Sequence, residues 1–127
     1  MSILTKAQIL SSKDSKTETV SVPEWGGEVI IKLMSGAEKD AWEEECYGNR
    51  EPDEQKKFRN VRATLAAFII VDDAGKQLFT VEEIEKLGEK SRTALDRIWA
   101  RGSKLNKLSK SDIEELSKNS VSEPNGN

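Results

Sequence analysis

The sequence of 127 residues contains no histidine and only one cysteine, Cys46. Histidine is the commonest general base and the commonest metal ligand, so its absence removes the usual starting point for both kinds of site. A hydroxyl such as that of Ser91 has no imidazole to activate it as a nucleophile. A lone cysteine cannot form an internal disulfide, which favours a reducing compartment. We therefore expect no enzymatic activity, no metal and no cofactor.

Long apolar runs and an excess of charge of one sign are also missing. The longest uninterrupted apolar run covers residues 65–71, far short of the roughly 20 residues that a membrane helix needs. The N-terminus has no cationic-then-apolar signal pattern. The formal net charge is only -3, so no general attraction to nucleic acid or to an anionic membrane is expected. These absences favour a soluble, intracellular protein that binds neither nucleic acid nor a membrane.

What remains is a short, strongly charged chain. Charged residues make up 34% of the sequence and aromatic residues 6%, which predicts a modest core under a well-solvated surface. A chain of this length forms one domain. We place that domain at residues 1–117 and interpret residues 118–127, which are polar and rich in turn formers, as a disordered tail.

The first third of the chain predicts a short helix and a β-hairpin. The helix is expected over residues 5–11, with Ile9 and Leu10 as its apolar anchors. Polar and apolar residues then alternate, and residues 29–31 are β-branched, as is typical of strands. The segment Pro23-Glu24-Trp25-Gly26-Gly27 between them suits a turn, because glycine adopts positive φ at no steric cost. We interpret residues 18–33 as a hairpin with a five-residue connection, which must pack on helices to be stable.

Capping signals divide the rest of the chain into helices. Ser35 with Glu38, and Thr80 with Glu83, have the form of capping boxes. The resulting helices are expected to end near Tyr47 and at Gly88, where glycine suits a left-handed C-cap. Further helices are predicted from Asp53 to about Ile70 (apolar face Phe58, Val61, Leu65, Phe68, Ile69), from Ser91 to about Leu105, and from Ser109 or Ser111 through Leu116. The fold class is α+β: a mostly helical single domain with an N-terminal hairpin packed on four to five helices.

Acidic residues offer no convincing metal site. Asp72 and Glu83 have the spacing of the first and twelfth positions of a calcium-binding loop. The sixth position, however, is Gln77 where the loop needs glycine. A plain turn leading into a capped helix is the better interpretation.

The helix pair around Gly88 leaves a second function open, that of a small DNA-binding or regulatory protein with a helix-turn-helix-like unit. Its second helix carries four cations and one acid, but the cations spread around the whole polar side. Its first helix is acidic and would face phosphates poorly. A solvated amphipathic helix is the favoured interpretation. The residues concerned are Arg92, Arg97, Arg101, Lys104 and Asp96 in the second helix, and Glu82, Glu83 and Glu85 in the first.

The three tryptophans differ in setting. Trp42 and Trp99 lie on apolar helix faces and are predicted to be core residues. Trp25 lies in the hairpin turn, where burial is difficult. It either caps the hairpin against a helix, which is favoured, or serves as an exposed anchor for a partner.

An ordered set of short segments resembles the tail assembly chaperones of long-tailed bacteriophages. The sharpest is Val22-Pro23-Glu24-Trp25-Gly26-Gly27, followed by Leu33-Met34-Ser35-Gly36-Ala37-Glu38 and by Val71-Asp72-Asp73-Ala74-Gly75-Lys76 with Leu78-Phe79-Thr80. Segments around Leu87, Leu95 and Leu105 continue the resemblance, which extends over residues 3–118.

The resemblance implies a non-enzymatic protein that acts during tail assembly in the host cell cytoplasm and is absent from the mature virion. The implied partners are the tape measure protein, which the chaperone keeps soluble, and the tail tube protein, which it helps to recruit. Many members have a second, C-terminally extended form made by ribosomal frameshifting. The resemblance supplies no residue-level binding motif.

Candidate binding residues therefore come from the residues themselves. Besides Trp25, the apolar side chains Leu105, Leu108, Ile113 and Leu116 fall near the C-terminal end. They are hypothesised to form a surface for the client or for self-association. The alternative, that they pack on the body of the domain, stays open.

Overall fold

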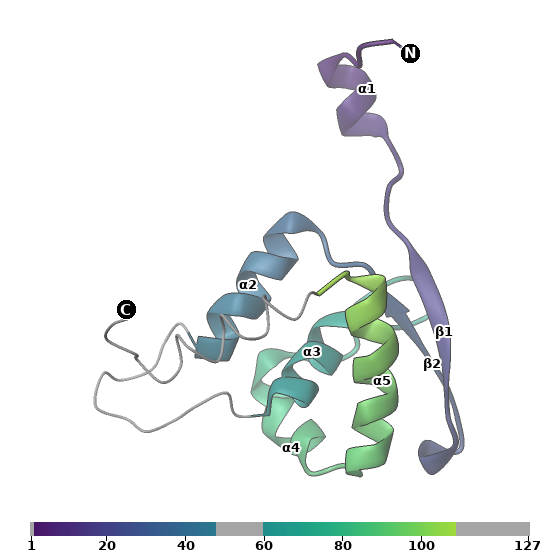
Figure 1. Ribbon diagram of the computed structural model, residues 1–127, viewed down its shortest axis with the longest axis vertical. Helices are drawn as coiled ribbons and strands as arrows, with labels where there is room; N and C mark the ends of the chain where they lie inside the picture. Colours follow the sequence, from purple (N-terminus) through teal and green to yellow (C-terminus); the bar gives the residue numbers. More distant parts are fainter. Residues whose placement is uncertain (1, 48–59, 109–127) are drawn as a thin grey trace.

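A small antiparallel sheet and four packed helices make up the body of the protein in the computed structural model, which describes residues 2–47 and 60–108 (Figure 1). The sheet has the order β1-β2-β3. The helix α3 contacts α2, α4 and α5, and α5 also lies against β1 and β2. The elements are α1 (Lys6–Ser11), β1 (Thr17–Val22), η1 (Pro23–Trp25), β2 (Gly27–Lys32), α2 (Gly36–Tyr47), α3 (Val61–Ile69), β3 (Ile70–Val71), η2 (Val81–Glu83), α4 (Ile84–Gly88) and α5 (Arg92–Leu105).

The predicted hairpin is present, with a shorter connection than expected. Val22 pairs with Gly27, so the connection has four residues and Gly27 already belongs to β2. Within this connection only Gly26 adopts a positive φ, of 77°. Val20 and Val22 are buried while Thr19 and Ser21 face solvent, which confirms the alternation predicted for this strand.

The third strand was not predicted. Ile70 was expected to end a helix, but Ile70 and Val71 pair with Ile31 and Ile30 of β2. Both are buried and β-branched, so they suit a strand that is covered on both faces. The turn after them is set by the carboxylate of Asp72, whose Oδ1 accepts hydrogen bonds from the backbone N–H groups of Ala74 and Lys76 at 2.8 and 2.9 Å.

The helix α3 is the centre of the core, as predicted. Every residue from Ala63 to Ile69 is buried. Its neighbours contribute buried side chains from α2 (Trp42, Cys46), α4 (Ile84, Leu87) and α5 (Ala94, Leu95, Ile98). The predicted start of this helix at Asp53, and Phe58 on its apolar face, lie outside the described residues.

The predicted capping residues act as expected at three helices. Ser35 Oγ accepts from the N–H of Glu38, whose carboxylate accepts from the N–H of Ser35 at 2.8 Å. Thr80 and Glu83 form the same reciprocal pair, although the first turn that they cap is the 3-10 turn η2. Ser91 Oγ accepts from the N–H of Ala94 at the start of α5. Local sequence therefore decides where these helices begin.

The predicted role of Gly88 as a left-handed C-cap is wrong. Among the described glycines only Gly26 and Gly75 have positive φ. At Gly88 a Cβ atom would lie 2.7 Å from Oδ1 of Asn60, just before α3. Gly88 is therefore explained by the close approach of α4 to the start of α3, a contact between distant parts of the sequence.

Gly102 allows α5 to approach α3. A Cβ at this position would lie 2.5 Å from Cδ1 of Ile69, which is fully buried. We predict that Gly102→Ala destabilises the protein by about 1–2 kcal/mol, because overpacking outweighs the roughly 1 kcal/mol gain in helix propensity. Ile69→Val removes Cδ1, so it should cost less in the Gly102→Ala background than alone. Urea unfolding of the native protein, the two single variants and the double variant measures this coupling. Additive effects of the two substitutions would contradict it.

The side chain of Asn106 joins the end of α5 to the end of β2. Its Oδ1 accepts from the backbone N–H of Met34 at 2.7 Å. Its Nδ2 donates to the carbonyls of Lys32 and Gly102 at 3.2 and 3.0 Å. Asn106 is 9% exposed, so these bonds form largely away from solvent.

We predict that Asn106→Ala lowers the free energy of unfolding by about 1–3 kcal/mol, because the buried N–H of Met34 loses its acceptor. Urea denaturation followed by circular dichroism measures the change. Lys104→Ala, an exposed substitution in the same turn, should stay within about 0.5 kcal/mol of the native protein. Equal effects of the two substitutions would contradict the role assigned to Asn106.

Candidate partner-binding surfaces

An open apolar groove lies between the end of the hairpin and α4. Its lining combines three half-buried or buried apolar side chains from distant segments, Trp25 in η1, Phe79 after β3 and Leu87 in α4. The charged residues Glu83, Lys86 and Lys90 complete the lining. The groove has a volume of about 360 Å³, which is room for a few apolar side chains of a partner.

Two exposed apolar residues lie close in the sequence to the groove residue Phe79. Leu78 is 51% and Val81 43% exposed, and they precede and follow the groove residue Phe79 in the sequence. Single exposed apolar residues need no explanation, whereas an open apolar groove is typical of an interaction site. The groove and its surroundings are therefore suited to binding an apolar segment of another protein.

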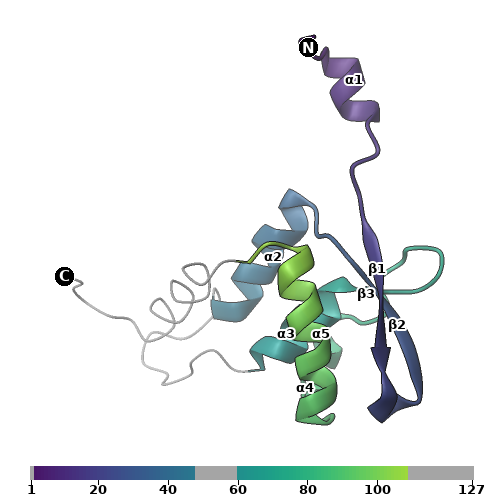
Figure 2. The same cartoon turned by 45° about the vertical axis from the view of Figure 1, so that its right-hand side comes forward.

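A second uncovered apolar surface is carried by α1. This helix stands apart from the body beyond the start of β1 (Figures 1 and 2), and none of its residues is buried. Ile9 and Leu10, predicted as anchors, are 54% and 76% exposed, and Ile3 and Leu4 before the helix are 92% and 61% exposed. The helix was predicted correctly, but in the described residues nothing covers its apolar side chains.

The arginines of α5 are held in ion pairs. Arg97 Nε lies 2.8 Å from Oε1 of Glu24, and Arg101 pairs with Glu18 of β1. These two pairs join the hairpin to α5. Arg92 pairs with Asp96 one turn along the helix. Because α5 also buries one side against α3, it lacks the free cationic stripe that DNA binding by the helix pair around Gly88 would need.

The pair between Glu24 and Arg97 changes the ionisation of both groups. The hydrogen bond from Arg97 lowers the pKa of the Glu24 carboxyl to about 2, from an ordinary value of 4.5. The same bond raises the pKa of Arg97. Glu24 therefore stays ionised well into the acid range, and the hairpin turn keeps its charge contact with α5 at neutral pH.

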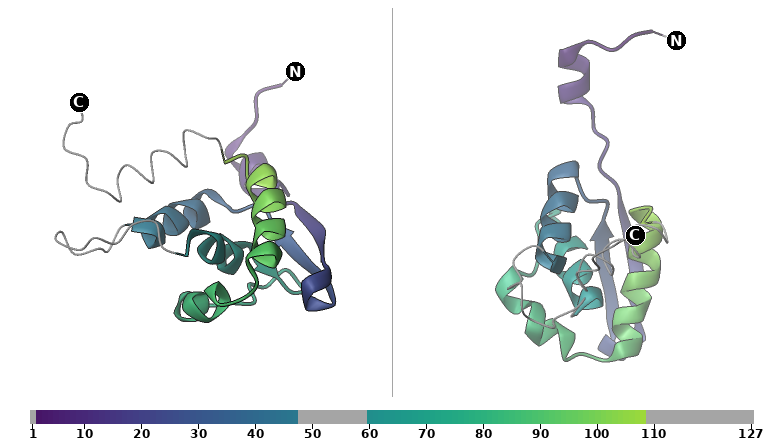
Figure 3. Two further views of the ribbon diagram at one scale, coloured as in Figure 1. Left: turned by 60° about the horizontal axis from the view of Figure 1, so that its bottom comes forward. Right: turned by 60° about the vertical axis from the view of Figure 1, so that its left-hand side comes forward.

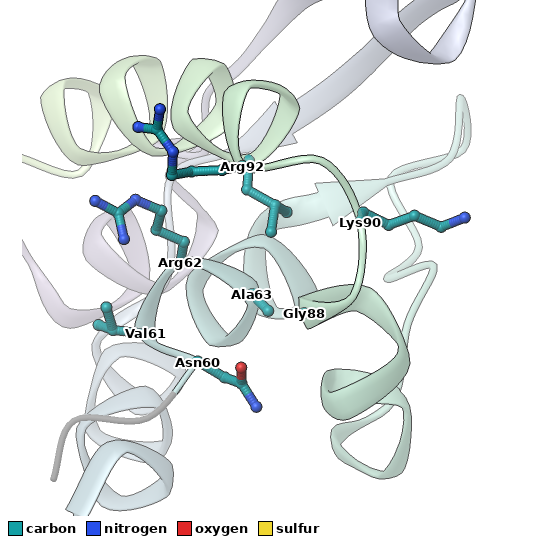
Figure 4. A pocket seen from close by; sticks show the side chains of 8 residues that line it. Asn60, Val61, Arg62, Ala63, Gly88, Lys90 and Arg92 are labelled. Atoms are coloured by element: carbon teal, nitrogen blue, oxygen red, sulfur yellow. The ribbon is translucent and has the colours of Figure 1, made fainter.

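A polar pocket opens where the first turns of α3 and α5 meet (Figure 4). Arg62 and Arg92 extend on one side of it while Lys90 extends the other way (Figure 4). Both arginines pair with Asp96, so the positive charge here is partly neutralised. Among residues 2–47 and 60–108, no group of three or more His, Cys, Asp or Glu side chains is placed to hold a metal ion.

The predicted site residues fall into three groups. Trp25 lines the groove. Leu105 and Leu108 are half-buried and pack against the core cluster. Ile113 and Leu116 lie outside the described residues. Sequence reasoning did not find Phe79 and Leu87, because only the fold brings them next to Trp25; the Leu78-Phe79 pair in a polar stretch was the available signal.

These surfaces define a small α+β binding protein, and the comparisons with known proteins agree. A family model described as phage tail assembly chaperone matches residues 5–119. The chain therefore belongs to the family of phage tail assembly chaperones, which is non-enzymatic.

A solved structure supports the fold. The tail assembly chaperone of bacteriophage HK97 is similar with a TM-score of 0.51 and 20% sequence identity, over 82% of this chain and 92% of that chain. No curated protein matches the sequence. None of the described helices combines the length and apolar character needed to cross a membrane.

The lowered pKa of Glu24 predicts a pH-dependent contribution to stability. A carboxyl whose pKa is lower in the folded state stabilises the fold above its unfolded pKa, and this contribution is lost as the pH falls through the folded pKa. The difference in unfolding free energy between the native protein and Glu24→Gln should be constant near neutral pH. It should shrink below pH 4.5 and vanish near pH 2. Urea unfolding at several pH values tests this prediction. If the difference in unfolding free energy between the two proteins does not change with pH, the ion pair of Glu24 with Arg97 does not stabilise the fold.

Proposed function

We propose that this tail assembly chaperone binds the tape measure protein of its phage, keeps it soluble and helps to recruit tail tube subunits around it. The family supports the general role. The observation that carries the finer proposal is the open apolar groove of Trp25, Phe79 and Leu87. The site of action is the host cytoplasm, and the protein leaves before the virion is complete.

The groove has the chemistry that a helical client needs. An amphipathic helix binds by placing its apolar side chains in an apolar groove while its polar face stays in water. Lys86, Lys90 and Glu83 beside the groove can contact the polar flanks of such a helix. The 34% of charged residues keeps the chaperone itself soluble while the groove is open.

Trp25 is the proposed anchor residue of this surface. Tryptophan is enriched among the residues that contribute most to binding energy, because it buries a large apolar area with few rotatable bonds. Trp25 is half-buried, and one part of it packs against the core. The remaining part is available to a partner. Leu105 and Leu108 are the weaker candidates for client contact, because they pack against the core as Trp25 does but do not line the groove.

Co-expression with the tape measure protein encoded nearby tests the function. The tape measure protein is expected to be insoluble alone, and soluble and bound when this chain is present. A soluble-fraction pull-down measures both properties. If the client stays insoluble and unbound with this chain and also with any C-terminally extended form that the gene encodes, the proposed function is wrong.

The groove itself is tested by comparing two tryptophans. Trp25→Ala should reduce the client recovered in the pull-down by about tenfold, corresponding to roughly 1.4 kcal/mol of binding energy. Trp99→Ala is the matched control, because Trp99 is also half-buried and packed on the core but does not line the groove. Urea unfolding of both variants shows whether they lose similar stability. Equal client recovery by the two variants would exclude the groove as the binding site.

A further inference from the structure

The strand β1 has one edge that no other described strand pairs with. It is the outer strand of the sheet and is hydrogen-bonded to β2 alone. The N–H of Leu33 donates to the carbonyl of Lys16 at 2.9 Å, immediately before the pair of Thr17 with Lys32. Lys16 and Leu33 are therefore a hydrogen-bonded pair, and such pairs alternate along antiparallel strands. By this alternation, the N–H and C=O groups of every second residue of β1 point away from β2. These residues are Thr17, Thr19 and Ser21.

The outward backbone groups are free to pair with another chain. They have no hydrogen-bond partner among the described residues, and they follow one another over about 13 Å of extended chain at roughly 3.3 Å per residue. Exposed edges are commonly blocked by proline, lysine or a bulge. β1 contains neither Pro nor Lys, and its register with β2 is continuous from Thr17 to Val22. The edge is therefore open to an added strand.

An open hollow lies beside this edge. It has a volume of about 380 Å³ and is lined by Val20 and Ser21 of β1 and by Arg97, Ala100 and Arg101 of α5. Because Val20 and Ser21 point to opposite faces of the sheet, a hollow that touches both reaches the edge of the strand. Figure 3 shows α5 beside the hairpin in both views. A strand added to β1 would thus have room for alternate side chains between the sheet and α5.

The surroundings of the edge carry an excess of positive charge. Residues 13–24 and 97–108 contain six Lys or Arg and three Asp or Glu, although the net charge of the whole chain is -3. Glu18 and Glu24 are each paired with an arginine of α5. Four exposed cations form no ion pair among the described residues, and charge complementarity with them favours an acidic partner. They are Lys13, Lys16, Lys104 and Lys107.

We infer that the free edge of β1 binds an extended, acidic segment of a partner protein as an additional strand. The outward backbone groups supply the hydrogen bonds, the hollow receives alternate side chains, and the excess of cations selects acidic flanks. A second copy of this chain fits the edge less well, because its own edge has the same positive surroundings. The edge shares no residue with the groove of Trp25, so the inference does not depend on the proposed client.

A synthetic peptide tests the edge on the unaltered full chain. The probe is fluorescein-labelled Glu-Asp-Thr-Val-Thr-Val-Asp-Glu, and its affinity is measured by fluorescence anisotropy. The first control replaces the four acids with lysine. Two further controls carry N-methyl groups on the amides of both threonines or of both valines, which lie on opposite edges of an extended peptide.

The acidic peptide should bind at least about tenfold more tightly than the lysine peptide. One of the two N-methylated peptides should lose at least about tenfold in affinity while the other keeps it, because only one edge of the peptide faces β1. The inference is overturned if the acidic peptide does not bind, if the lysine peptide binds equally well, or if the two N-methylated peptides bind alike.

A variant of the strand gives a second test. Thr19→Pro removes an outward N–H, and a proline is tolerated on an edge strand at a position whose N–H takes no part in the ladder. It should weaken binding of the acidic peptide at least about tenfold, whereas the control Thr19→Val, which keeps the N–H, should stay within about twofold. Equal binding by the two variants would contradict the inference. If Thr19→Pro does not fold, as judged by circular dichroism, the N-methylated peptides still decide the question.

Amide hydrogen exchange shows whether the edge is free. The outward amides of β1 should exchange fast in the protein alone and become protected when the acidic peptide is added. The amides of Glu18, Val20 and Val22 should be protected in both states, since they bond to β2. Outward amides that are already protected in the protein alone would mean that a second copy covers the edge, if protection rises with concentration, or another part of the chain, if it does not. Either result would refute the inference while leaving the groove of Trp25, which is tested separately, unaffected.

Discussion

The rest of the structure depends on the burial of α3 from all sides. Seven consecutive residues from Ala63 to Ile69 are buried, and a helix that is apolar around its whole circumference must be enclosed by other elements. α2, α4 and α5 surround it. The strand β3 that continues from α3 carries two more buried residues, Ile70 and Val71, into the sheet. One apolar run therefore supplies both the central helix and the edge strand of this small domain.

The helices around α3 can enclose it only by packing closely against it. Glycines permit this close approach, and polar side chains fix the positions of the surrounding elements. Gly102 lets α5 lie against Ile69, and Gly88 lets α4 reach Asn60. Asn106 then ties the end of α5 to the end of β2 through two hydrogen bonds, with Met34 and Lys32, while a third bond to the carbonyl of Gly102 fixes its side chain on α5. The ion pairs of Glu24 and Glu18 with α5 hold the hairpin in place. Their contribution to stability is modest because they are largely exposed, but they orient the turn that carries Trp25.

Local features of the fold were predictable and long-range features were not. The capping residues Ser35, Thr80 and Ser91 and the alternation of Val20 and Val22 act within a few residues, so the sequence alone reveals them. β3 was missed because Ile70 and Val71 continue the apolar pattern of α3, and only pairing with β2 distinguishes strand from helix there. Gly88 was misassigned because its close neighbour, Asn60, is far away in the sequence.

The distinction between local and long-range features also explains which residues of the candidate site could be predicted from the sequence. Trp25 was noted as a possible anchor, but Phe79 and Leu87 join it only through the fold. The Pro-Glu-Trp-Gly segment resembled the family, whereas no catalytic or metal-binding residues in the sequence indicated a function. The roles of its four residues in the structure explain why the segment was informative. Pro23 begins η1, Glu24 binds Arg97, Trp25 lines the groove and Gly26 takes the positive φ that closes the turn. Four adjacent residues thus meet four separate requirements, three of them structural and one the recognition role that we propose for Trp25. Because the family is non-enzymatic, no catalytic motif can mark its members, and a segment that combines several structural requirements is a clearer mark of membership.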